Sequence, residues 1–175
     1  FSDTDAIILA AGRGSRLGKL GIDCPKGLIE VDGESFVERS VAQLREAGIG
    51  RITIVTGQCG EQYEERLGRR PGIRLVRNMR YQQTGSFESL RLGMFESAPT
   101  SVVLDSDIVY ESLGLQAVTS SEEEAVILVS ALTQSGDEVY VSAREHILTS
   151  LTKSFPEDPR FLVGEFVGIS KLGPS

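Results

Sequence analysis

Cysteine, histidine and tryptophan are scarce in this 175-residue chain, which has two Cys, one His and no Trp. Cys24 and Cys59 are too few for a disulfide framework or a zinc site, so we interpret them as free thiols in a reducing cytoplasm. No apolar run approaches the roughly 20 residues that span a bilayer. The N-terminal FSDTD is polar and has no basic lead-in, which argues against a signal peptide. We therefore expect a cytoplasmic protein that does not bind a membrane.

Positive charge is also in deficit, because 18 Lys and Arg face 25 Asp and Glu, a formal net charge of −7. Binding to nucleic acid or to an anionic membrane needs a broad basic surface, so we exclude both classes of partner. A few clustered cations can still bind a small phosphorylated ligand on an acidic protein. The sequence does have 19 glycines and 40% hydrophobic residues, enough for one globular domain with a sizeable core.

Apolar runs alternate with amphipathic segments along most of the chain. AIILA (6–10) is typical of a strand buried on both faces. Further strands are expected at 51–57, 73–76, 101–110 and 124–132, and helices at 36–47, 59–68 and 86–97. The segments EVYVSA, ILTSLT and FLVGEFVGISKL follow as a β-rich part. This order predicts an α/β fold, a three-layer αβα sandwich with a mostly parallel mixed sheet and antiparallel strands at one edge.

Local signals define some of these elements more closely. Ser35 followed by Glu38 predicts a capping box at the start of the helix at 36–47, and Gly48 ends it. GLIEV (27–31) is expected to be a short extended piece. The charge run SSEEEA (120–125) is interpreted as a solvated loop or the start of a helix.

A cationic, glycine-rich loop follows the first expected strand in IILAAGRGSRLGKLGIDCPKGLIEV. Gly12 and Gly14 allow close approach of the backbone to a ligand, and Arg13 and Arg16 can donate charge-assisted hydrogen bonds to phosphate oxygens. Ligands of α/β sheets bind at the carboxyl ends of the strands, so we expect a polyphosphate here. The spacing fits neither the G-x-G-x-x-G dinucleotide fingerprint nor a P-loop.

The element L-A-A-G-x-G-S-R-L, followed after a spacer by P-K-G-L, resembles the signature of nucleotidyltransferases that couple a nucleoside triphosphate to a phosphorylated small molecule. The resemblance runs from Ala6 to about Leu172. It implies a Rossmann-like fold and a single nucleotidyltransferase domain over residues 1–175, which either lacks a C-terminal segment or is part of a larger protein. It also implies that Lys26 and Arg16 are catalytic, since both can neutralise charge on the reacting phosphates. The nucleotide would be held by Leu9, Ala10, Ala11, Gly12, Arg13, Gly14 and Ser15.

Two aspartates end the expected strand at 101–110, within LDSD (104–107). Asp105 and Asp107 would point to the same face if the strand persists. Two carboxylates at this position suit Mg²⁺, which we expect as the cofactor; the alternative for Asp105 is to cap the following turn. The resemblance places its metal aspartate at Asp107. In related enzymes a second acidic ligand comes from late in the chain, and here it is either absent from the sequence or another acid such as Glu165.

The segment NMRYQQTGSFESL (78–90) carries the signal for the base. Backbone amides at the helix start near Gly85, with the hydroxyls of Thr84, Ser86 and Ser89, can bind a base edge or a phosphate; an ordinary capped helix is the alternative. Sugar-1-phosphate members of the superfamily carry a Gln-Pro-x-Gly-type element here, and this chain does not. The pattern resembles the branch of bacterial phosphocholine cytidylyltransferases and their 2-aminoethylphosphonate-using relatives, which implies CTP as the donor.

The expected acceptor therefore bears a phosphate or phosphonate at one end and an ammonium at the other. Carboxylates or aromatic faces would bind the ammonium, and the candidates are Asp137, Glu138, Tyr140 and Glu165. A quaternary ammonium needs a cage of several aromatic rings, and the region offers only Tyr140, Phe161 and Phe166. A primary ammonium is better met by carboxylates, which favours 2-aminoethylphosphonate over phosphocholine.

The expected reaction is an in-line attack by the acceptor oxygen on the α-phosphorus of CTP. Such an oxygen is already a nucleophile at neutral pH, so we assign no general base and leave His146 as a surface residue. Two alternatives stay open. One is a sugar-1-phosphate or molybdopterin-type nucleotidyltransferase that uses another nucleotide, and the other is a non-catalytic nucleotide-binding regulatory domain. Nothing in the sequence indicates the oligomeric state.

Overall fold

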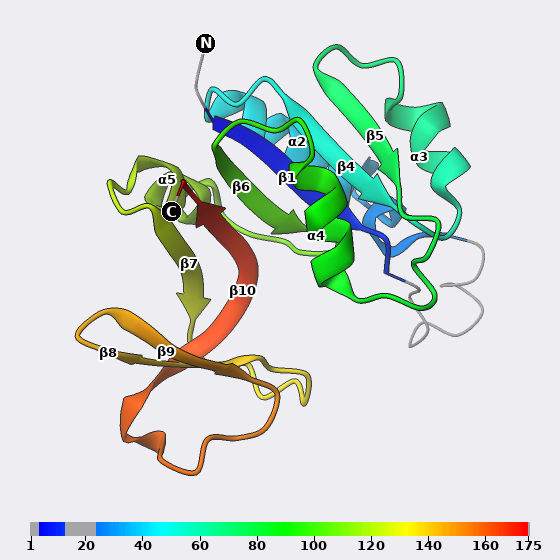
Figure 1. The fold of residues 1–175 in the computed structure, drawn as a ribbon. Coiled ribbons are helices and arrows are strands. Elements are labelled where there is room, and N and C mark those ends of the chain that lie inside the picture. Colours follow the sequence, from blue (N-terminus) through cyan, green and yellow to red (C-terminus); the bar gives the residue numbers. More distant parts are fainter. Residues whose placement is uncertain (1–3, 13–23, 175) are drawn as a thin grey trace.

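The computed structural model describes residues 4–12 and 24–174 (Figure 1). The strands are β1 (Thr4–Ala10), β2 (Glu30–Val31), β3 (Glu34–Ser35), β4 (Ile52–Thr56), β5 (Ile73–Arg77), β6 (Thr100–Asp105), β7 (Ala125–Ser130), β8 (Tyr140–Arg144), β9 (Ile147–Thr152) and β10 (Leu162–Leu172). The α-helices are α2 (Phe36–Glu46), α3 (Gly60–Leu67), α4 (Ser86–Met94) and α5 (Ser112–Ser120), and short 3₁₀ turns are formed by Lys26–Leu28 and Pro159–Phe161.

Eight strands form one mixed sheet in the order β5-β4-β1-β6-β10-β8-β9, with β7 also paired to β10. The pairs β5–β4, β4–β1 and β1–β6 are parallel, whereas β10 runs antiparallel to β6, β7 and β8. A separate two-stranded sheet joins β2 to β3. This arrangement confirms the predicted α/β fold with a mostly parallel mixed sheet and antiparallel additions.

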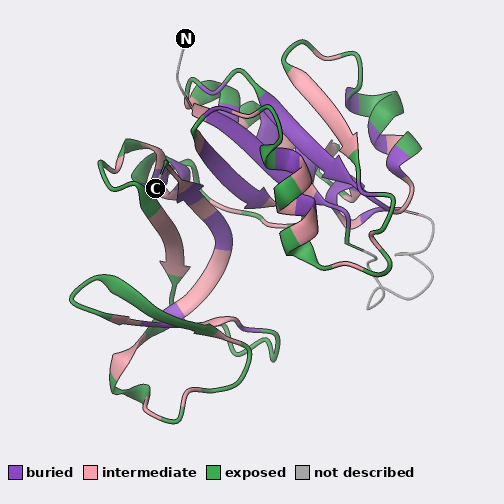
Figure 2. Ribbon diagram, viewed as in Figure 1, coloured by how far each residue is buried: buried purple, intermediate pink, exposed green. Residues whose placement is uncertain are grey.

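The centre of the sheet is apolar on both faces because its middle strands are covered by helices on each side. Along β1, alternate side chains point to opposite faces. Ala6 and Ile8 pack in the larger core cluster with residues of α2, α3 and α5, whereas Ile7 packs in the smaller cluster with Leu90 of α4. In Figure 1, α4 lies in front of the sheet and α2 lies behind it, and α3 packs in the same core cluster as α2. These layers form the αβα sandwich, and the buried strands are purple in Figure 2.

Helix α2 begins at the predicted capping box. The Ser35 hydroxyl accepts a hydrogen bond from the Glu38 backbone amide, and the Glu38 carboxylate accepts one from the Ser35 amide. Gly48 follows the helix with a φ of 84°, a left-handed conformation that favours glycine. The start and end of this helix were therefore both readable from local sequence.

The C-terminal β-rich part departs from the compact sandwich. Strand β10 is long and pairs with β6 through its second half and with β8 through its first half. It pairs with β7 in both halves, on either side of a register shift between Phe166 and Ser170. The β8–β9 hairpin therefore extends beyond the parallel half of the sheet (Figure 1). Most of β9 is exposed, as Figure 2 shows in green.

Several elements differ from the sequence predictions. Residues 27–31 are not one extended piece, because the carbonyl oxygens of Pro25 and Lys26 accept hydrogen bonds from Leu28 and Ile29 and close a 3₁₀ turn. The strand expected at 101–110 ends at Asp105. Helix α5 was not predicted. No helix within the described ranges has both the length and the apolar character needed to cross a bilayer.

The helix expected at 86–97 is shorter, since α4 ends at Met94, and its apolar face is only partly covered. Leu90 packs on the core, but Phe87 is 79% exposed and Met94 is 41% exposed. The helical periodicity of the sequence does not show which apolar side chains another element covers. In α4 only the middle of the apolar face packs against the core.

Candidate functional site: a cleft at the carboxyl ends of the parallel strands

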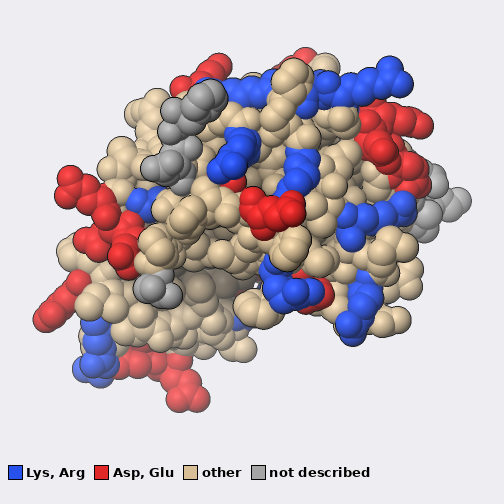
Figure 3. Space-filling model, turned by 45° about the horizontal axis from the view of Figure 1, so that its top comes forward, with Lys and Arg blue, Asp and Glu red and all other residues tan. Residues whose placement is uncertain are grey.

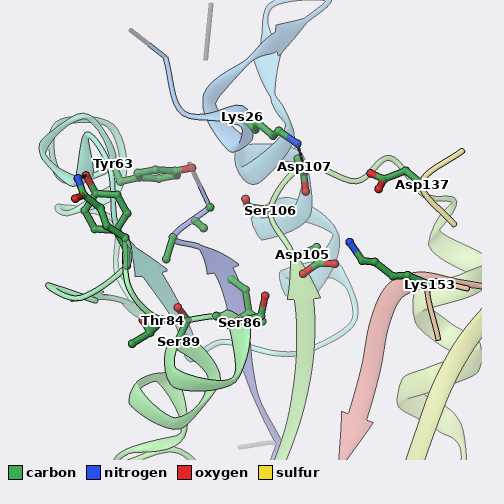
Figure 4. Close-up of a pocket in the computed structure, with 17 residues that line it drawn as sticks. Lys26, Tyr63, Thr84, Ser86, Ser89, Asp105, Ser106, Asp107, Asp137 and Lys153 are labelled. Carbon is green, nitrogen blue, oxygen red and sulfur yellow. Dashed lines mark hydrogen bonds and ion pairs between the residues drawn. The ribbon is translucent and has the colours of Figure 1, made fainter. Parts of the chain in front are cut away.

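A cleft of about 550 Å³ lies at the carboxyl ends of β1 and β6, where ligands of α/β sheets bind. It is bounded by the ends of these two strands, the 3₁₀ turn that begins at Lys26, helix α3 and the start of α4 (Figure 4). The lining residues are Leu9, Ala10, Ala11, Gly12, Lys26, Tyr63, Tyr81, Gln82, Thr84, Gly85, Ser86, Ser89, Asp105, Ser106, Asp107, Asp137 and Lys153.

Lys26 and Asp107 meet across this cleft although they are 81 positions apart in the sequence. Lys26 Nζ lies 3.1 Å from Asp107 Oδ2, and the two side chains are 34% and 35% exposed. The 3₁₀ turn aims the lysine inward, and the turn after β6 brings the aspartate to it (Figure 4). The structure thus brings together a cation and a carboxylate that the sequence analysis had assigned to separate roles.

Asp105, the last residue of β6, is the more buried of the two acids. Burial raises its pKa, and the nearby negative charge of Asp107 raises it further, whereas Lys26 lowers it; the result is a pKa of about 6. The side chain of Asp105 lies against Gly168 on the neighbouring strand β10. A Cβ at Gly168 would stand 2.8 Å from Asp105 Oδ2, and Gly168 has a φ of 90°, so glycine is required there both by space and by conformation.

The end of β1 supplies backbone to the floor of the cleft. The carbonyl oxygen of Leu9 accepts a hydrogen bond from the Ser106 amide at 3.2 Å, which ties the turn after β6 to β1. Beyond Leu9, the backbone of Ala11 lies close to Gly57. A Cβ added to Gly57 would stand 2.7 Å from the Ala11 carbonyl oxygen and 2.8 Å from Tyr81 Cβ. The small residues Ala10, Ala11 and Gly12 leave this stretch of backbone accessible.

The segment before α4 is organised by one buried amide. Asn78 is 1% exposed, and its Nδ2 donates hydrogen bonds to the hydroxyl oxygens of Thr84 and Ser89, each at 3.1 Å. The N-cap of α4 is Gly85, which has no side-chain cap. Amides at a helix start with no side-chain partner can serve an anion or a base edge. Thr84, Ser86 and Ser89 all lie along this wall (Figure 4).

The four residues expected to bind the acceptor lie in different places. Asp137 lines the cleft. The Glu138 carboxylate instead accepts hydrogen bonds from the Ser135 hydroxyl and the Gly136 amide. Its own backbone amide first, and then these neighbours, hold the pKa of Glu138 below the usual value. Tyr140 packs edge-on against Phe155 with ring centroids 5.3 Å apart.

Glu165, the remaining acceptor candidate, accepts hydrogen bonds from the Thr133 amide at 3.0 Å and from its hydroxyl at 3.2 Å. Glu138, Tyr140 and Glu165 are therefore not among the residues that line the described cleft, and their part in binding an acceptor stays a prediction. Arg13, Gly14, Ser15 and Arg16 lie outside the described residues, so the cationic loop is represented here by Gly12 and Lys26 alone.

Sequence reasoning did not find several cleft residues. Lys153, in the loop after β9, points toward Asp105 (Figure 4) and provides a second cation. Tyr63 comes from α3, and Tyr81 and Gln82 from the turn before α4. Only the last two fall in a segment that the sequence analysis had singled out. Lys153 belongs to no motif that could have signalled it.

The acids of the cleft fit a magnesium ion. Over residues 4–12 and 24–174 no three His, Cys, Asp or Glu side chains cluster closely enough to form an all-protein metal site. Mg²⁺ does not need one, since it is held by one or two carboxylates together with phosphate oxygens and water. Burial first, and then the negative charge of Asp107, raises the pKa of Asp105, and a divalent cation beside the two carboxylates would favour their ionised forms.

The charges outside the cleft are mixed. On the face shown in Figure 3, blue basic and red acidic side chains are interspersed and form no continuous basic surface. Lys26 and Lys153 bring positive charge into the cleft, which suits a small anionic ligand.

The chain is similar in sequence and in fold to proteins of known family. The choline-phosphate cytidylyltransferase of Streptococcus pneumoniae is 39% identical over 102 residues, which cover 58% of this chain and 44% of that protein. The 2-aminoethylphosphonate cytidylyltransferase of Lancefieldella rimae is 38% identical over 87 residues, 50% of this chain and 35% of that protein. The aligned regions thus span less than half the length of these curated relatives.

A solved structure of CTP:phosphocholine cytidylyltransferase from Streptococcus pneumoniae matches with a TM-score of 0.73 at 25% identity, over 97% of this chain and 71% of that chain. Residues 6–160 match the sequence profile of the family described as the MobA-like NTP transferase domain. That match takes in most of the chain, including β1, Lys26 and the acidic turn after β6, and the chain therefore belongs to the MobA-like NTP transferase domain family.

Proposed function

We propose that the protein is a Mg²⁺-dependent cytidylyltransferase that couples CTP to a small phosphonate or phosphate bearing an amine, with 2-aminoethylphosphonate as its acceptor. The products are the CMP-linked phosphonate and pyrophosphate. The observation that carries the proposal is the meeting of Lys26, Asp105 and Asp107 in one cleft at the carboxyl ends of β1 and β6. The similarity to two cytidylyltransferases supports CTP as the donor.

The cleft has separate surfaces for the two ends of the nucleotide. The backbone of Leu9 to Gly12 and the wall formed by Thr84, Gly85, Ser86 and Ser89 would hold the base and ribose. Lys26, together with Arg13, Gly14, Ser15 and Arg16, would hold the triphosphate. Asn78 donates to the oxygen atoms of Thr84 and Ser89, and the Thr84 hydroxyl donates in turn to the Arg80 carbonyl oxygen at 2.9 Å, which leaves the Ser89 hydroxyl to donate to the nucleotide.

Magnesium would be held by Asp107 and Asp105 together with phosphate oxygens. There it would supply Lewis-acid stabilisation of the charge on the transferring phosphate. The ion pair between Lys26 and Asp107 has to open when the ligands bind, so that the lysine can turn to the phosphate. This costs little, because a pair exposed to solvent by a third contributes about 0–1 kcal/mol.

The acceptor would lie on the side of the cleft formed by Lys153 and Asp137. Lys153 would bind the phosphonate oxygens, and the Asp137 carboxylate would bind the ammonium. Two of the aromatic side chains that the sequence offered for caging a quaternary ammonium are engaged elsewhere. Tyr140 packs on Phe155, and the Arg144 guanidinium covers the Phe161 ring at 3.9 Å. A primary ammonium therefore suits the described cleft better than choline does.

In the reaction, an acceptor oxygen attacks the α-phosphorus of CTP in line with the departing pyrophosphate. The bond from the α-phosphorus to the bridging oxygen breaks, and the electron pair leaves with pyrophosphate. Lys26 neutralises the negative charge that builds up on the phosphates in the transition state. The acceptor oxygen is ionised at neutral pH, so no protein group has to remove a proton.

A pyrophosphate-release screen tests the proposal. The protein is incubated with Mg²⁺ and each of CTP, UTP, GTP and ATP, in turn with 2-aminoethylphosphonate, phosphocholine and a sugar 1-phosphate. We expect release with CTP and 2-aminoethylphosphonate. Release only with GTP or UTP and a sugar phosphate would contradict the proposal and favour a sugar-phosphate enzyme, and binding of CTP without any release would favour a regulatory domain.

A further inference from the structure

The hydroxyl of Tyr63 is a buried polar group that the proposed reaction does not use. Tyr63 lies on α3, its side chain is fully buried, and its phenol reaches toward Lys26 and Ser106 at the wall of the cleft (Figure 4). The hydroxyl oxygen is inaccessible to solvent and has no hydrogen-bond partner among the described residues. A tyrosine at this place needs an explanation, because a phenylalanine would fill the same core.

The Tyr63 hydroxyl also lies at an informative place, close to the backbone beside Lys26 and between the two aspartates. A Cβ built on Gly27 would stand 2.7 Å from the Tyr63 oxygen and 2.9 Å from Ser106 Cβ. Gly27 follows Lys26 directly, and Ser106 separates Asp105 from Asp107. The phenol oxygen thus lies beneath the point where the catalytic cation and the two carboxylates come together.

The hydroxyl is a proton donor at every pH at which the protein would work. Burial is the main cause that raises the pKa of Tyr63, and the charge of Asp107 adds to it, so the group stays protonated. Ser106 and the Gly27 backbone lie near enough to offset part of this rise, although neither forms a hydrogen bond of normal geometry with the oxygen. A buried donor without a partner destabilises the ligand-free protein.

We propose that the Tyr63 hydroxyl binds the nucleotide, by donating a hydrogen bond to a phosphate oxygen at the Lys26 end of the cleft. The partner that the hydroxyl does not find among residues 4–12 and 24–174 then arrives with the ligand. A phosphate suits the place, because Lys26 brings positive charge to it and a phosphate oxygen is a strong acceptor. This inference rests on the proposed function, since it takes CTP as the ligand.

Tyr63→Phe tests the inference, and the chain offers a matched control in Tyr110→Phe. Tyr110 also has a pKa raised by burial and a buried hydroxyl oxygen for which the described part of the chain offers no hydrogen-bond partner, but it does not line the cleft. The dissociation constant of CTP with Mg²⁺ is measured by calorimetry for the wild type and both variants. The melting temperature of each protein without ligand is measured alongside.

We expect Tyr63→Phe to weaken CTP binding about tenfold, the loss of one hydrogen bond to a charged group. Its ligand-free melting temperature should equal or exceed that of the wild type, because an unpartnered donor has been removed. Tyr110→Phe should bind CTP as the wild type does.

Wild-type affinity of Tyr63→Phe for CTP would overturn the inference and leave the proposed function standing. A lower ligand-free melting temperature for Tyr63→Phe than for Tyr110→Phe would also overturn it, because the hydroxyl would then be structural. A wild-type protein that binds no CTP would overturn the proposed function, and this inference with it.

Discussion

Replacing Lys26 with methionine should separate catalysis from stability. Methionine keeps most of the length of the side chain and removes the charge. In the folded protein the lysine forms an ion pair with Asp107 at 3.1 Å, and both partners are about one-third exposed. Solvent screens such a pair, so its loss should lower the free energy of unfolding by no more than about 1 kcal/mol. For a chain of this length, that shifts the melting temperature by about 2–4 °C.

The expected effect on turnover is far larger. Removal of one preorganised group that stabilises developing charge lowers kcat by about a hundredfold to a thousandfold. The assay measures pyrophosphate release at saturating CTP and acceptor, so that weaker binding cannot imitate slower chemistry. We therefore expect Lys26→Met to melt almost as the wild type does and to turn over at least about a hundred times more slowly.

Lys171→Met is the control for this experiment. Lys171 is a buried lysine on β10 that donates a hydrogen bond to the Ser121 carbonyl oxygen, away from the residues that line the cleft. Its replacement leaves a carbonyl without its partner, so it should lower the melting temperature and leave kcat of the folded protein unchanged. Turnover by Lys26→Met at the wild-type rate, or equal losses of turnover in both variants, would refute the role of Lys26.

Three further predictions concern neighbouring residues. The pKa of Asp105 is raised from an ordinary 3.8 to about 6, so the folded protein loses stability as the pH rises between these values. Asp105→Asn should therefore stabilise the ligand-free protein by up to about 3 kcal/mol at pH 7 and by little at pH 4. Equal shifts of the melting temperature at both pH values would contradict this. Gly168→Ala should destabilise the protein by at least about 1 kcal/mol in chemical denaturation, because of its φ of 90° and the 2.8 Å approach to Asp105; an unchanged unfolding midpoint would count against it. Asn78→Ala should raise the KM for CTP as Thr84 and Ser89 lose their shared donor, and a wild-type KM would show that this bonding does not orient them for the nucleotide.

Elements with strong local signals were predicted from the sequence. Helix α2 could be located because its capping box and terminal glycine act within a few residues of the chain. The apolar run of β1 predicted a central strand, and β1 indeed pairs on both sides. These features depend on neighbours in sequence, so they are visible before the fold is known.

Features that depend on tertiary contacts were not predicted. Helix α5 has only a weak amphipathic pattern, and it was missed. The exposed ends of the apolar face of α4 could not be foreseen either, because periodicity does not say where a neighbouring element stops. The turn after β6 carries Asp107 beyond the strand, where it forms an ion pair with Lys26.

The site divides in the same way. Lys26 and Asp107 could be expected in one cleft, because the carboxyl ends of adjacent parallel strands meet at one edge of a sheet and the family signature marks both residues. Tyr63 and Lys153 could not, since they reach the cleft from α3 and from the loop after β9 and belong to no sequence motif. Glu138 was chosen for its charge, but its hydrogen bonds to Ser135 and Gly136 appear only in the structure.

The most direct test is a crystal structure of the protein with CTP and Mg²⁺. The account predicts that the triphosphate lies between Lys26 and Asp107, with the metal ion bound to Asp107 and the base against Ala10, Ala11 and the start of α4. A triphosphate bound elsewhere, with the interaction between Lys26 and Asp107 left intact, would contradict it.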